Sequence, residues 1–164
     1  MGTRAQALAE RIERGAAELI AFAETLSEAE WQTEGTSDRR AVGTVIHHVA
    51  SAYLVEASLV QRLASGRAMD DVTVERVDQG NAQHAAQNPS PGKAETLELL
   101  MRNSALAAQA IRGLTDEQLD WAAPNSLHAG APLTTQYFIE QHPIGHSYHH
   151  LAKIRAAIEA HTSA

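Results

Sequence analysis

"HPIGHSYHHLAK", residues 142–153, places four histidines in one short segment near the end of the chain. His142, His146 and His150 recur at every fourth residue, and His149 stands beside the last of them. Successive helical residues turn by about 100°, so residues four apart differ by only about 40° and share one face. The segment predicts a helix with a stripe of imidazoles. Three interpretations stay open: a surface stripe, a polar patch in a core, or a metal site.

The composition favours a helical fold and limits the chemistry of any metal site. The chain has 164 residues, a natural length for one domain, and we expect residues 1–164 to form a single domain. It is 44% hydrophobic but only 4% aromatic, an alanine-rich composition that favours helices over sheets. Because the chain has no cysteine, a metal would need His, Asp or Glu ligands.

Charge and hydropathy exclude several classes of partner. The net charge is -7, from 13 basic and 20 acidic residues, and no run of Lys or Arg stands out, which argues against nucleic-acid binding. Charged residues interrupt the first 15 positions, "MGTRAQALAERIERG", so neither a signal peptide nor a membrane span is predicted there. We therefore expect a cytoplasmic protein with no nucleic-acid or membrane partner.

Apolar residues recur with helical periodicity in four long stretches, at about 3–26, 38–65, 91–113 and 133–160. Ser37 or Asp38 is a candidate cap of the second helix, and Gly66 ends it. Ser90 is the expected cap of the third helix, with Pro91 at its first position.

Shorter helices are predicted between the long ones, around Trp31, within residues 74–88 and within residues 114–121. No segment alternates apolar and polar residues as a half-buried β-strand does. The sequence predicts an all-α fold, a four-helix bundle with short accessory helices. The long second connection is where an up-down-down-up chain would cross over.

"VIHHVA", residues 45–50, offers a partner for the histidine stripe. On a helical wheel His48 borders the apolar face that holds Ala52 and Leu59, whereas His47 is turned away and is expected in solvent. His48 is therefore either a metal ligand or a histidine at the core edge that is hydrogen-bonded to a backbone carbonyl. Glu56 lies on the same apolar side, where an unpaired carboxylate is unfavourable.

Two alternatives stay open for Glu56. It accepts a hydrogen bond from a metal-binding imidazole, or it pairs with Lys153 on the histidine stripe. His142 is also ambiguous, because Pro143 follows it and bends the helix axis. It is swung away from the stripe, lines the mouth of a pocket, or adds a ligand. The remaining histidines are expected in solvent: His84, His128 and His161.

Two histidine motifs carry a resemblance to a known family. "TVIHHVASAY" (44–53) and "HSYHHLAKI" (146–154) resemble the DinB-like metal-binding four-helix bundles, and "GLTDEQLDW" (113–121) resembles their habitual linker. That superfamily includes YfiT-like proteins and thiol transferases related to mycothiol-dependent maleylpyruvate isomerase. Carried over by position, the resemblance implies that the metal ligands are His48, His146 and His150.

The resemblance also implies a chemistry: a divalent ion, zinc or nickel, with three histidine ligands and open positions for water or substrate. In transferase members the ion binds a thiol as thiolate, which attacks an electrophile. Because this chain has no cysteine, the low-molecular-weight thiol would be a diffusible cofactor.

The leading hypothesis is therefore a metal-dependent thiol S-transferase that acts on a small electrophile. The alternatives are a metal-dependent hydrolase, with Glu56 or another carboxylate as its base, and a non-enzymatic metal-binding stress-response bundle. A homodimer is a further expectation, with Leu54 as an outward apolar residue.

Overall fold

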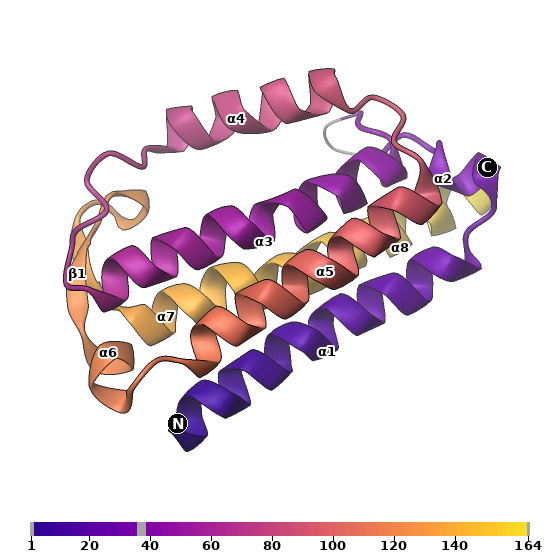
Figure 1. Cartoon of the computed structure of the whole chain (residues 1–164). Coiled ribbons are helices and arrows are strands. Elements are labelled where there is room, and N and C mark those ends of the chain that lie inside the picture. Colours follow the sequence, from indigo (N-terminus) through magenta and orange to yellow (C-terminus); the bar gives the residue numbers. More distant parts are fainter. Residues whose placement is uncertain (1, 36–38, 164) are drawn as a thin grey trace.

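Four long helices pack side by side in a computed structural model of the chain, which describes residues 2–35 and 39–163. They are α1 (Thr3–Thr25), α3 (Val42–Ala64), α5 (Lys93–Arg112) and α8 (Gly145–Thr162). α5 packs between α1 and α3, and α8 contacts both α1 and α3 (Figure 1). The predicted four-helix bundle is confirmed.

The direction of each long helix gives the topology. In Figure 1, α1 and α8 run one way along the bundle, whereas α3 and α5 run the other way. The parallel pair α3 and α5 requires the chain to return along the whole bundle between them. Helix α4 (Val74–Gln87) makes this return on the outside, so the bundle is up-down-down-up.

The core consists of aliphatic stripes at the predicted spacing. On α1 the buried side chains include Leu8, Ile12 and Leu19, each less than 5% exposed. On α3, Val45, Val49 and Leu63 are buried. Ala52 and Leu59 were expected on the same buried face, but both are only partly buried and line a pocket instead. No helix within the described ranges is long and apolar enough to cross a membrane.

The accessory helices are also present, and local sequence explains two of them. Helix α2 (Glu28–Trp31) begins with a capping box in which Ser27 and Glu30 satisfy each other's backbone N–H groups. Thr115 and Gln118 do the same for α6 (Asp116–Asp120). The predicted helices around Trp31 and residues 114–121 therefore form for local reasons.

Two predicted helix starts need correction. The proposed caps Ser37 and Asp38 lie outside the described residues, and α3 begins only at Val42. α5 begins at Lys93 rather than Pro91, because Gly92 is extended and takes the N-cap position. The Pro91 carbonyl, just before it, accepts a hydrogen bond from the Trp31 indole at 2.9 Å.

Two glycines stand where a larger side chain would not fit: one at a close contact and one in a left-handed backbone conformation. Gly43 lies under the Trp31 ring, where an added Cβ would collide with the indole. Gly66 has φ of +76°, a left-handed conformation that ends α3 where the sequence predicts.

A small hairpin corrects the expectation of a purely helical chain. Strand β1 (Ala122–Asn125) pairs antiparallel with β2 (Ala131–Thr134) around the short 3₁₀ turn η1 (Ser126–His128). Each strand has only four residues and contains a proline, so no alternation was visible. The Met69 N–H donates to the Pro124 carbonyl of β1, at 3.0 Å. The Ser126 N–H, just after β1, donates to the Met69 carbonyl, also at 3.0 Å. The hairpin thus anchors the chain between α3 and α4.

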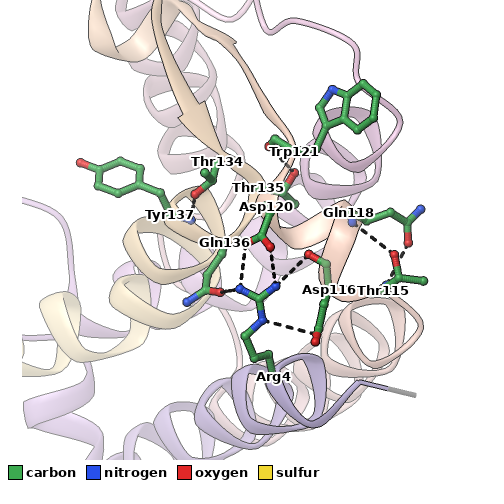
Figure 2. A network of polar contacts seen from close by, with 10 residues as sticks. All are labelled: Arg4, Thr115, Asp116, Gln118, Asp120, Trp121, Thr134, Thr135, Gln136 and Tyr137. Atoms are coloured by element: carbon green, nitrogen blue, oxygen red, sulfur yellow. Dashed lines mark hydrogen bonds and ion pairs between the residues drawn. The ribbon is translucent and has the colours of Figure 1, made fainter.

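A cluster of exposed polar groups ties the start of α1 to the end of the linker (Figure 2). The Arg4 guanidinium donates to both carboxylate oxygens of Asp120, at 2.7 and 2.9 Å, and to the backbone carbonyl of Asp116 at 2.8 Å. These bonds connect segments more than 110 residues apart in sequence.

Candidate metal centre

The last helical stretch begins with α7 (Thr135–Ile139), continues through a wide π-helical turn, η2 (Glu140–Ile144), and ends with α8. Within α8, His146 and His150 project from one face toward α3, where His48 meets them. The coordinating nitrogens of the three residues all lie within 4.8 Å of one another. His146 Nε2 and His48 Nε2 are 3.1 Å apart. The structure therefore brings together the three histidines that the sequence singles out.

The donor set fits a divalent metal ion. Nitrogens bound at about 2.0–2.1 Å in a tetrahedral site are separated from each other by roughly 3.3 Å. The three sets of ligand nitrogens lie within 4.8 Å of one another, and the pair from His48 and His146, at 3.1 Å, is close to that separation. Three histidine ligands leave a fourth position open, as in reactive rather than structural zinc sites.

Glu56 holds one of these imidazoles in place. Its Oε1 lies 2.8 Å from His146 Nδ1, so the Nδ1–H donates to the carboxylate. That hydrogen bond places the proton of a neutral His146 on Nδ1 and leaves the Nε2 lone pair facing His48. Glu56 is 8% exposed, whereas Lys153 is exposed. Of the two alternatives for Glu56, the structure selects the contact with His146.

Burial keeps His150 in the form that binds metals. Its side chain is 8% exposed, and desolvation, followed by the neighbouring His146 and His48, lowers its pKa to about 2. The imidazole is therefore neutral at physiological pH, with a nitrogen lone pair available.

His142 does not belong to the cluster of three. Pro143 lies inside the π-helical turn η2, and the His142 ring stacks on Phe138 with centroids 4.3 Å apart and planes at 27°. It lines the pocket beside the centre. Of the three alternatives for His142, the structure favours the pocket wall.

Two histidines expected in solvent meet each other instead. His47 Nδ1 lies 2.8 Å from His84 Nε2, and burial lowers the pKa of both rings. The expectation was wrong because α4 passes over α3 and places His84 beside the His47 and His48 rings, with centroids 5.0 and 5.5 Å away. His128 was also expected in solvent but lines the pocket, whereas His161 is exposed as predicted.

A pocket of about 1050 Å³ opens beside the three histidines. Its walls come from α3, α4, the hairpin turn and the α7–α8 segment, and they are largely apolar: Val55, Leu59, Val72, Val77, Leu127 and Phe138. Helix α4 has no buried residue and stands apart from the bundle (Figure 1). The pocket therefore combines a histidine cluster with an apolar wall large enough for a small-molecule ligand.

The fold and the cluster define a four-helix bundle with a three-histidine site open to a pocket. The chain belongs to the DinB superfamily, whose sequence profile matches residues 11–154. A search of curated proteins found no match. Among solved structures, the chain is similar to YfiT from Bacillus subtilis, described as a probable metal-dependent hydrolase with an unusual four-helix bundle topology. The likeness has a TM-score of 0.77 at 15% identity and covers 99% of this chain and 90% of YfiT, which shows a shared fold.

Proposed function

We propose that this protein is a divalent-metal-dependent transferase that joins a low-molecular-weight thiol to a small electrophile. The proposal is carried by one observation: the three-histidine cluster faces a pocket of about 1050 Å³ rather than a closed interior. Zinc or nickel are the expected ions. The volume is at the upper end of the range for small-molecule sites, which suits two reactants better than one reactant and water.

The residues of the chain have distinct roles in this proposal. His48, His146 and His150 hold the ion, which when bound favours the ionised form of a thiol or of water. Glu56 orients His146 through its hydrogen bond to Nδ1. The apolar wall around Leu59 and Phe138 binds the apolar part of the electrophile.

Metal-assisted hydrolysis is the second candidate, favoured by the structural likeness to YfiT. Glu56 was considered as its base. Its Oε1 is engaged by His146, but its Oε2 is buried and makes no hydrogen bond within the described part of the chain. Metal-assisted hydrolysis predicts turnover without any thiol, whichever group acts as the base.

One experiment separates the candidates. The zinc-loaded and nickel-loaded proteins are incubated with 1-chloro-2,4-dinitrobenzene and, in turn, mycothiol, bacillithiol or glutathione. Product formation that requires both thiol and metal supports the transferase. Hydrolysis of a p-nitrophenyl ester without thiol supports the hydrolase. Bound metal without either activity contradicts both and leaves a metal-binding bundle.

The expected homodimer and cytoplasmic location stay predictions. Leu54 is 43% exposed on α3, as an apolar contact would require. Light scattering of the purified protein measures the oligomeric state directly.

A further inference from the structure

The π-helical turn gives His142 a position that the helix alone would not give it. In a continuous α-helix, His142 would lie one turn before His146 and extend the line of ligands. The turn η2 contains Pro143 and is wider than an α-helical turn, so it rotates His142 out of that line. His142 lies outside the group of three and against the pocket wall. Wide turns of this type are frequent at functional sites.

The His142 ring is oriented but incompletely bonded. Phe138 stacks on one face, and His128 meets it edge-on with centroids 6.5 Å apart. Its Nε2 is buried and has no hydrogen-bond partner among the described residues. A buried polar atom left unsatisfied costs roughly 1–3 kcal/mol, so a purely structural histidine would be expected to have a partner. His142 lines the pocket, so a ligand bound there would supply one once the ring turns toward it.

The groups around His142 set its protonation state. Burial lowers its pKa, and the nearby His146 and His128 act in the same direction. Glu56, across the pocket on α3, opposes them by favouring the protonated ring. The imidazole is therefore neutral before a reactant arrives, and a carboxylate is close enough to stabilise the charge once it has formed.

We propose that His142 is a catalytic residue that accepts the proton of the thiol at this site, an inference that rests on the proposed transferase function. As the S–H bond breaks, the proton moves to the imidazole and the electron pair stays on sulfur. That pair forms the new carbon–sulfur bond while the leaving group departs with its own bonding pair. The imidazolium proton then passes to the leaving group or to solvent.

Calorimetry counts this proton without requiring turnover. Zinc-loaded wild type and His142→Gln are titrated with 2-mercaptoethanol at neutral pH in buffers of different ionisation enthalpy. The variant is expected to release about one more proton per bound thiol than wild type, because it has no internal acceptor. Its zinc affinity is expected to stay within about twofold of wild type, since His142 is no ligand. His161→Gln, exposed near the end of α8, is the matched control and should behave as wild type.

Each other outcome contradicts the assignment in a distinguishable way. An equal proton count in wild type and variant, with thiol bound to both, shows that His142 is not the acceptor. Loss of zinc from His142→Gln makes it a ligand instead. If wild type binds zinc but no thiol, the transferase proposal itself fails, and the role of His142 in thiol ionisation fails with it.

Discussion

Two polar networks join distant parts of this chain, and they differ in how completely they are satisfied. The Arg4 cluster is exposed, and its guanidinium bonds to Asp120, Asp116 and Gln136 (Figure 2). The histidine cluster is half-buried, and two buried atoms at its edge, Glu56 Oε2 and His142 Nε2, have no hydrogen-bond partner among the described residues. Both networks connect segments about 90 or more residues apart.

The difference separates a structural contact from a functional one. An exposed, satisfied ion pair needs nothing more and contributes little to stability. A buried, incompletely bonded network costs stability unless another group completes it. The histidine cluster therefore has the incomplete bonding expected of the proposed metal site, whereas the Arg4 cluster holds the N-terminal helix against the linker.

Substitution of a proposed metal-binding histidine is expected to give the largest change in zinc binding. His48→Ala or His150→Ala should weaken zinc binding by more than about a hundredfold, since even the loss of a group that only hydrogen-bonds to a ligand costs about 10–100-fold. Elemental analysis and competition with a chromophoric chelator measure the change, and circular dichroism checks the fold. His161→Ala, an exposed histidine on α8, should keep full occupancy. Full occupancy in both ligand variants would refute the ligand assignment.

Glu56→Gln is expected to lower zinc affinity less than the histidine variants do. Glutamine can still accept from His146 Nδ1 but lacks the negative charge that makes the imidazole a stronger ligand. Zinc affinity should fall by about tenfold, the lower end of the range for changes to a group that hydrogen-bonds to a metal ligand. The same competition assay measures it, with Glu159→Gln on the exposed end of α8 as control. Wild-type affinity in Glu56→Gln would mean that the carboxylate does not tune the centre.

Acidification should destabilise the metal-free protein through His150. The pKa of this imidazole is lowered to about 2 in the fold, whereas an unfolded histidine titrates near 6.5. Below the unfolded value the unfolded chain gains a proton that the folded chain does not, so the free energy of unfolding decreases as pH falls. His150 alone should lower it by about 1 kcal/mol from roughly pH 6.5 to pH 5.5. Urea unfolding after chelator treatment measures this, and His150→Gln should lose that part of the slope.

The Arg4 cluster should give the smallest effect. Arg4→Ala removes exposed ion pairs to Asp116 and Asp120, and the thermal midpoint should fall by only about one or two degrees. Zinc binding should be unchanged, because the cluster does not touch the histidines. A change in zinc affinity in Arg4→Ala would instead couple the two networks.

Sequence reasoning succeeded where the position of a residue depends on a single helix. The wheel placed His48 at the core edge, and the four-residue spacing placed His146 beside His150, because both follow from local helical geometry. It failed for His47 and His84, whose contact depends on how α4 crosses α3. It also missed the hairpin, whose four-residue strands are held partly by Met69 from a distant segment.

The position of His142 also depends on tertiary contacts that the local sequence does not determine. Pro143 predicts a disturbance of the helix, but several outcomes fit a proline at that point. Only the packing of Phe138 and the π-helical turn decides where the ring lies. Local sequence thus identifies a break in regularity, and tertiary contacts determine its consequence.

The outer helix α4 lines the pocket without forming part of the core, so the shape of the pocket and the stability of the fold depend on different residues. Since none of its residues is buried, substitutions at Val74 or Val77 can reshape this wall of the pocket at little cost to the stability of the bundle. Descendants of one ancestral scaffold could thereby diverge in the compounds they accept while the interior stays constant. The long return that this chain topology demands becomes the part most open to evolutionary change.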